Sequence, residues 1–124
     1  MTTPAYQAKT LSPIVPIADM DRSIRFYNEV LGFQTAMQSA EYSILTREGA
    51  SLHLTMAADE SVLEVTRGHM SFYLEIRGIE TLWEHVFAFK ERYKIRDLSD
   101  REYGMREFHI LDPDGCLIFV GEPI

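Results

Sequence analysis

Residues 104–123 read GMREFHILDPDGCLIFVGEP. Two apolar-rich runs, Met105–Leu111 and Cys116–Val120, flank the tetrapeptide Asp112-Pro113-Asp114-Gly115. Pro113 presets φ for the second position of a turn, and Gly115 can adopt a positive φ at little cost. Two short apolar runs separated by such a turn are typical of a β-hairpin, which we therefore predict here.

A weaker copy of this hairpin lies upstream. The segment Ile44–His53 (ILTREGASLH) aligns with Ile110–Phe119 (ILDPDGCLIF), so that Gly49 matches Gly115. The offset between Ile44 and Ile110 is 66 residues, about half of the 124-residue chain. The two hairpins therefore suggest that one supersecondary unit is used twice.

The first half of the chain predicts a strand, a helix and three further strands. Apolar residues recur at helical spacing from Met20 to Leu31; Asp19 or Asp21 can cap this helix, and Gly32 ends it. The expected strands are residues 13–18, 33–38, 41–46 and 51–56. Pro16 cannot donate a backbone hydrogen bond, so the first strand is confined to a sheet edge or an irregular pairing.

The second half repeats this order. Strands are expected at residues 70–76, 94–98, 105–111 and 116–120, and a helical apolar stripe begins at Ile79. The prediction is thus an α+β fold of two βαβββ modules within a single domain, residues 1–124. Module one spans about residues 11–56, an acidic linker residues 57–68, and module two about residues 69–123.

The composition of the chain and the motifs it lacks argue against several classes of function. The net charge of −7 disfavours nucleic acid as a partner, and it suits a cationic ligand or simply solubility. The chain has no apolar run long enough to span a membrane. Its one cysteine, Cys116, forms no internal disulfide, which fits a cytoplasmic location. Phosphate-binding loops, nucleophile elbows and HExxH zinc motifs are absent from the sequence.

Two runs of sequence resemble a known family. Residues 14–33 (IVPIADMDRSIRFYNEVLGF) resemble the opening module of the vicinal oxygen chelate superfamily, which includes glyoxalase I, bleomycin-resistance proteins and extradiol dioxygenases. Residues 104–123 resemble the bleomycin-resistance branch in particular. The resemblance covers roughly residues 11–123. It implies two paired βαβββ modules curled around a central cavity, usually in a homodimer, and in enzymatic members four His or Glu ligands holding a divalent metal.

The positions of those four ligands do not carry a complete metal site in this sequence. By the resemblance they fall on the residues Ser12, His53, Ser71 and Phe119. Only His53 is a competent ligand, whereas a catalytic site needs about three protein ligands. His69 lies two residues before Ser71 and is a displaced second candidate. We therefore predict no cofactor, with one divalent metal as the alternative.

The hairpins predict what lines the cavity instead. If each hairpin loop has four residues, Leu45 pairs with Ala50 and Leu111 pairs with Cys116. One face of module one then carries Tyr42, Ile44, Ser51 and His53, and the corresponding face of module two carries Phe108, Ile110, Leu117 and Phe119. The predicted ligand-binding residues are Tyr42, Ser51, His53, Phe108 and Phe119. The alternative for the three aromatic residues is the hydrophobic core, and for His53 a hydrogen-bonded strand position.

Three hypotheses for the function follow. The first is a bleomycin-resistance-like protein that sequesters a small molecule, cationic or aromatic, in a dimeric crevice without catalysis. The second is a metal-dependent lyase, isomerase or dioxygenase of the same superfamily, with His53 and His69 as partial ligands. The third is a purely structural or regulatory dimer.

Overall fold

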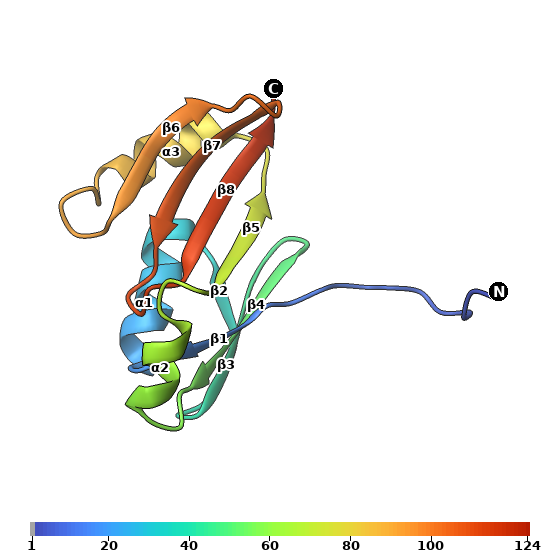
Figure 1. The fold of residues 1–124 in the computed structure, drawn as a ribbon, viewed down its shortest axis with the longest axis vertical. Helices are drawn as coiled ribbons and strands as arrows, with labels where there is room; N and C mark the ends of the chain where they lie inside the picture. Colours follow the sequence, from blue (N-terminus) through green and yellow to red (C-terminus); the bar gives the residue numbers. More distant parts are fainter. Residues whose placement is uncertain (1) are drawn as a thin grey trace.

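The computed structural model describes residues 2–124. Its elements are β1 (Ile14–Ile17), α1 (Met20–Leu31), β2 (Gln34–Gln38), β3 (Tyr42–Arg47), β4 (Ala50–Met56), α2 (Glu60–Thr66), β5 (Ser71–Glu75), α3 (Ile79–Phe87), β6 (Ile95–Asp100), β7 (Met105–Leu111) and β8 (Leu117–Pro123). The strands and the helices α1 and α3 follow the predicted order, and the segment predicted as a linker, residues 57–68, contains a further helix, α2. The pattern βαβββ occurs twice along the chain, once before and once after α2 (Figure 1). The predicted α+β duplication is therefore confirmed. Module one denotes α1 with β1–β4, and module two denotes α3 with β5–β8.

Each module forms its own four-stranded sheet with the same topology. The strand orders are β1-β4-β3-β2 and β5-β8-β7-β6. The first strand of each module runs parallel to the last, and the other pairs are antiparallel. Pro16 lies in β1 at a sheet edge, as its missing N–H requires.

Local sequence accounts for both ends of α1. Asp19 is the N-cap: its carboxylate accepts the N–H of Arg22 at 3.0 Å. Gly32 ends the helix at φ 71°, a left-handed conformation that glycine adopts without a Cβ clash. The apolar side of α1 is buried against β2, β3 and β4 of its own sheet.

Helix α3 obtains its N-terminal cap from a distant part of the chain. Gly78 occupies the N-cap and has no side chain to accept a hydrogen bond. The Glu122 carboxylate, in β8, instead accepts the N–H groups of Gly78 at 3.2 Å and Ile79 at 3.0 Å. The negative charge also interacts favourably with the helix dipole, so this contact fixes α3 on its sheet.

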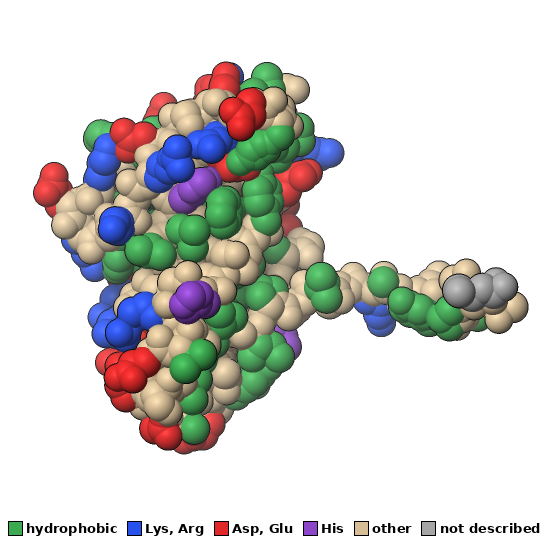
Figure 2. Space-filling model, in the orientation of Figure 1, with side chains coloured by type: hydrophobic (Ala, Val, Ile, Leu, Met, Phe, Trp, Pro, Cys, Tyr) green, Lys and Arg blue, Asp and Glu red, His purple; other side chains and the backbone are tan. Residues whose placement is uncertain are grey.

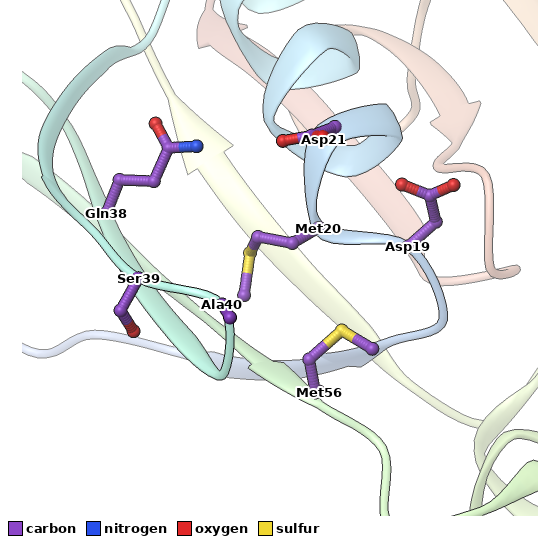
Figure 3. A pocket seen from close by; sticks show the side chains of 7 residues that line it. All are labelled: Asp19, Met20, Asp21, Gln38, Ser39, Ala40 and Met56. Carbon is purple, nitrogen blue, oxygen red and sulfur yellow. The ribbon is translucent and has the colours of Figure 1, made fainter.

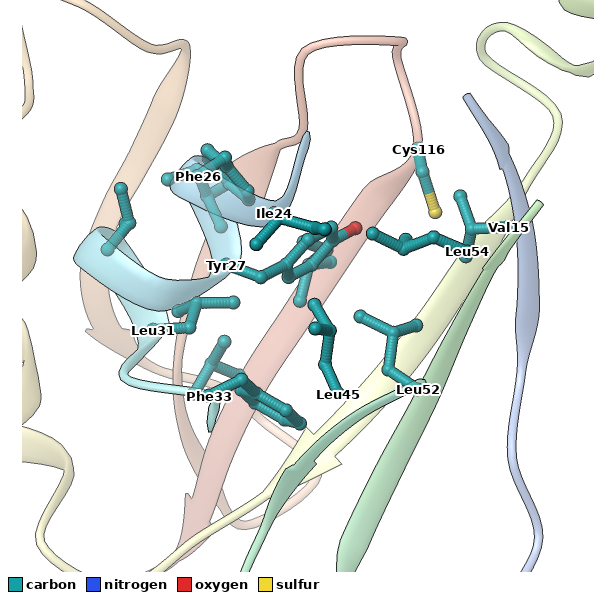
Figure 4. Packing of buried hydrophobic residues seen from close by; sticks show 14 of the residues in the cluster. Val15, Ile24, Phe26, Tyr27, Leu31, Phe33, Leu45, Leu52, Leu54 and Cys116 are labelled. Atoms are coloured by element: carbon teal, nitrogen blue, oxygen red, sulfur yellow. The ribbon is translucent and has the colours of Figure 1, made fainter. Parts of the chain in front are cut away.

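One hydrophobic core runs through both modules. It includes α1 residues Ile24 and Phe26 together with Phe108 and Ile118 of module two. Helices α1 and α3 contact each other, and Phe26 meets Tyr93 edge to face with ring centroids 4.9 Å apart. Figure 4 shows side chains from α1 and the strands meeting in this core.

The turn of the last hairpin also joins the modules. Asp112 accepts the Tyr27 hydroxyl at 2.8 Å and the N–H groups of Asp114 and Cys116 at 2.9 Å each. Asp114 accepts a hydrogen bond from the guanidinium of Arg22 at 2.9 Å. Both aspartates are buried. The sequence predicted their role in the turn, but their contacts with α1 were not anticipated.

The first hairpin is tighter than predicted. Arg47 pairs with Ala50 across a two-residue turn, and Leu45 pairs with Leu52, so the predicted four-residue loop is wrong. This error shifts the partner strand by two residues, which leaves every side chain on the same face. Tyr42, Ile44, Ser51 and His53 therefore share one face, as predicted.

The second hairpin has a five-residue connection, and here the error changes the faces. Leu111 pairs with Leu117 and not with Cys116. A shift of one residue moves a strand's side chains to the opposite face. Phe108 consequently lies opposite Val120 in the core, and Phe119 lies opposite His109 on the other face. The prediction that Phe108 and Phe119 share a face is wrong.

Candidate functional site

Each sheet has one face packed against helices and one face turned away from them, which we call the open face. In module one the buried Leu52 and Leu54 of β4 alternate with His53, which lies on the open face and is half-buried. The Tyr42 hydroxyl and His53 Nδ1 are 2.6 Å apart and form a hydrogen bond. Ile14 on the neighbouring β1 is 53% exposed. This face therefore combines one histidine with apolar surface.

The open face of module two is aromatic. The strand register sets Tyr73 of β5, Phe119 of β8 and His109 of β7 side by side. The rings of Tyr73 and Phe119 are within 13° of parallel with centroids 6.2 Å apart, and His109 lies 4.3 Å from Phe119. Tyr73 is 45% exposed. Planar or apolar molecules bind such surfaces by stacking and burial.

A buried carboxylate lies beside these rings. Glu107 of β7 has no exposed side-chain surface. Its Oε1 accepts the Tyr103 hydroxyl at 2.6 Å and contacts His109 Nε2 at 3.0 Å, and its Oε2 accepts the Tyr73 hydroxyl at 2.7 Å. We call Tyr73, Tyr103, Glu107, His109 and Phe119 the carboxylate–aromatic cluster.

The hydrogen bonds keep Glu107 ionised. Burial favours the protonated form, but the bonds from Tyr103, Tyr73 and His109 together outweigh it, so that the pKa of Glu107 lies below its ordinary value. Since a carboxylate only accepts hydrogen bonds, Nε2 of His109 carries the proton that faces it. Burial and the bond to Glu107 raise the pKa of Tyr73, and the bond to Glu107 raises the pKa of Tyr103.

The stability of the protein should depend on the ionisation of Glu107. Because its pKa is lower in the folded protein than in the unfolded chain, this residue adds stability above about pH 4.5, and the contribution is lost as the pH falls through the folded-state pKa. Glu107→Gln is expected to lower the free energy of unfolding by about 1–3 kcal/mol at pH 7. Urea unfolding at pH 7 and pH 3 should show this difference shrinking at the lower pH.

The comparison with Glu107→Gln at each pH removes the effect of other groups. Burial raises the pKa of Asp112, so its effect on the pH dependence of stability is opposite in sign to that of Glu107. This effect is present in the original protein and in Glu107→Gln, and it cancels in the comparison. A difference in unfolding free energy that is the same at pH 7 and pH 3 would contradict the role assigned to the Glu107 charge.

The donor set at the four superfamily ligand positions does not fit a metal ion. Ser12 and Ser71 are poor ligands for transition metals, Phe119 has no donor atom, and His53 is bonded to Tyr42. His69 lies in a turn before β5 begins at Ser71, so it is not on the strand face considered for it. Among residues 2–124, no three His, Cys, Asp or Glu side chains group closely enough to hold a metal.

Two hollows on the surface lie away from the predicted residues. One, of about 390 Å³, is lined by Asp19, Met20, Asp21, Gln38, Ser39, Ala40 and Met56 at the start of α1 (Figure 3). The other, of about 300 Å³, is lined by Gly32, Gln34, Thr46, Arg47 and Glu48. Neither includes Tyr42, Ser51, His53, Phe108 or Phe119.

The structure places the predicted ligand-binding residues in three environments. Tyr42, Ser51 and His53 lie on the open face of module one, and Phe119 lies on that of module two. Phe108 is fully buried against Trp83 of α3 and is not available there. Tyr73, Tyr103, Glu107 and His109, which form a cluster with Phe119, were not among the predicted residues. The i, i+2 spacing of Glu107 and His109 on one strand was a usable signal, but the two tyrosines come from other segments.

Known proteins are similar to this chain in sequence and in architecture. Residues 10–120 match the family model described as Glyoxalase/Bleomycin resistance protein/Dioxygenase superfamily. The chain belongs to this superfamily. A bleomycin resistance protein from Geobacillus stearothermophilus is 29% identical over 119 residues, covering 86% of this chain and 90% of the relative.

Solved structures of superfamily proteins have the same fold. A bleomycin-binding protein in complex with bleomycin has a TM-score of 0.80 at 21% identity, covering 94% of this chain and all of that one. A bleomycin-binding protein from Streptomyces verticillus, in complex with copper(II)-bleomycin, has a TM-score of 0.77 at 17% identity, with coverage of 97% and 100%. Within residues 2–124, no helix of this superfamily member is long and apolar enough to cross a membrane.

Proposed function

We propose that this superfamily member sequesters a bleomycin-type antibiotic or a related small molecule, by binding and without catalysis. The observation that carries the proposal is Phe119, which stands where the superfamily's fourth metal ligand is expected and stacks beside Tyr73. An aromatic wall at this position favours burial of planar groups over coordination of substrate oxygens. The bleomycin-binding relatives support the choice of ligand. The net charge of −7 would attract a cationic glycopeptide.

The binding crevice in this proposal forms between two copies of the chain. Ile14 and Tyr73 leave apolar surface exposed on the two open faces, and neither residue lines the two surface hollows described above. The N-terminal arm, with Tyr6 and Leu11 exposed, extends away from the body (Figures 1 and 2). A second copy would cover such surface, as exposed apolar patches commonly indicate. The proposed location is the cytoplasm.

Calorimetric titration with bleomycin, with and without copper(II), tests the function. We expect one ligand per chain and a Kd in the micromolar range or below. Phe119→Ala should weaken binding by about 10-fold or more, since it removes a stacking surface. The control is Phe87→Ala, which removes an equally large exposed aromatic ring from α3. Absence of binding, or equal losses in both variants, would overturn the proposal.

Two further measurements address its other parts. Sedimentation should give a dimer, and a monomer at the ligand-binding concentration would exclude a crevice between copies. Elemental analysis of protein purified without an affinity tag addresses the metal alternative. One equivalent of tightly held metal that His53→Ala removes would favour a metal-dependent enzyme instead.

A further inference from the structure

The carboxylate–aromatic cluster holds a negative charge that no lysine or arginine of residues 2–124 neutralises by an ion pair. The basic side chain in contact with Glu107 is that of His109, whose Nε2 lies 3.0 Å from Oε1. The other two donors are neutral phenols, Tyr73 and Tyr103. A charge buried in this way acts in a medium of low effective dielectric constant, where its attraction for a cation above the face is stronger than in water.

A ligand cannot contact this carboxylate directly. The Glu107 side chain is fully buried, and both of its oxygens already accept hydrogen bonds. Tyr73, which is bonded to this carboxylate, is 45% exposed, and its ring is nearly parallel to that of the half-buried Phe119. The Tyr73 hydroxyl donates a hydrogen bond to an anion, which increases the electron density of its ring. Cations bind to such ring faces.

The protein already uses this type of contact once within the cluster. The guanidinium of Arg101 lies over the ring of Tyr103, 5.8 Å from its centroid. In the described part of the chain no lysine or arginine lies over Tyr73 or Phe119, although Tyr73 is 45% exposed. One of the two phenols bound to Glu107 therefore has a cation, and the other is open to one.

Two other charged residues belong to the same face. Arg96 of β6 pairs with His109 at the far side of the row, and its side chain is exposed to solvent. Glu75 lies two residues after Tyr73 on β5 and adds a second, exposed negative charge beside the phenol. Across the sheet the open face thus carries Tyr73, Phe119, His109 and Arg96 in this order, with the arginine next to His109 and the negative charge of Glu75 next to Tyr73.

We propose that Tyr73 and Phe119, above the buried carboxylate of Glu107, form a site for an alkylammonium group. The ring faces contact the cation, and Glu107 supplies the charge from below without touching it. This inference rests on the proposed function, because the site lies on the face that would line the crevice, and it names the ligand group held there.

Choline and its neutral isostere, in which carbon replaces the ammonium nitrogen, provide the test. Their affinities are measured by NMR titration of the whole chain. We expect choline to bind about 5- to 10-fold more tightly than the isostere. Glu107→Gln should abolish this preference by weakening the binding of choline more than that of the isostere. The matched control is Glu64→Gln on α2, which removes the same charge from an exposed position and should preserve the preference.

Equal affinity for the two probes, or an unchanged preference in Glu107→Gln, would overturn the inference. If circular dichroism shows that Glu107→Gln is unfolded, Tyr73→Leu carries the test, because loss of the ring should also abolish the preference. Bleomycin is titrated in parallel. If bleomycin binds but choline is not preferred, the alkylammonium site is refuted and the proposed function still holds. If choline is preferred but bleomycin does not bind, the site is supported and the proposed function is refuted.

Discussion

Replacing Asp112 with alanine is expected to lower the free energy of unfolding by about 3–5 kcal/mol. Its carboxylate accepts the Tyr27 hydroxyl and the N–H groups of Asp114 and Cys116, and all of these donors lie in buried surroundings. Alanine would leave each of them without a partner, at about 1–3 kcal/mol for a buried polar group. Urea unfolding at pH 7, followed by circular dichroism, measures the effect.

The control for this substitution is Asp97→Ala. The Asp97 side chain is 62% exposed and pairs with Lys90 at the surface, so its loss should cost less than about 1 kcal/mol. Tyr27→Phe gives an independent check, since it removes one donor and leaves the backbone bonds of Asp112 intact. If Asp112→Ala changes the free energy of unfolding by less than roughly 0.5 kcal/mol, the usual range of a surface substitution, the role assigned to the turn is refuted.

Replacing Gly121 with alanine is expected to disrupt the carboxylate–aromatic cluster. A Cβ atom at this position would lie 2.0 Å from the Tyr73 hydroxyl oxygen and 3.0 Å from Cγ of Glu107. One of the two side chains must move, and the bond between them breaks. We expect a loss of about 1–3 kcal/mol in unfolding free energy, typical of overpacking, together with loss of the preference for choline.

A double-mutant cycle identifies the contact that is responsible. In a Tyr73→Ala background the main clash is absent, so Gly121→Ala should cost markedly less than it does alone. Gly49→Ala is the matched glycine control, because no heavy atom lies within 4 Å of its added Cβ and its φ is not positive. Equal costs in both backgrounds would show that Tyr73 does not limit the space at Gly121.

The duplicated fold was predictable because the deciding features are local. Asp19 caps the start of α1, and Gly32 ends the helix by its left-handed backbone conformation. Pro16 restricts its strand to a sheet edge because it lacks an N–H group. Apolar periodicity then separates the helices from the strands between these residues. Contacts between distant segments carry no such local pattern. The bonds from Asp112 and Asp114 to α1 could not be anticipated from the turn sequence.

The candidate site depended on strand register, which sequence specifies less well. In module one the predicted register was wrong by two residues, so the side chains were still assigned to the correct faces. In module two it was wrong by one residue, and Phe108 lies in the core and not on the face with Phe119. The burial of Glu107 could not be predicted from the sequence, for a different reason. A glutamate on an open strand face is expected to be exposed, whereas Glu107 is buried and accepts hydrogen bonds from Tyr73 and Tyr103, which come from other segments.

The two copies of the repeated unit are no longer interchangeable. Asp114, in the last turn of module two, is bonded to Arg22 and Ser23 of module one. In the first hairpin, Arg47 instead donates to the carbonyl of Gly32 within its own module. A module-two fragment would therefore lack the partners of its own turn, while module one would lose the acceptor that holds the start of its helix. Folding of each half is coupled to the other, so the chain should unfold cooperatively, although its architecture is that of two repeats.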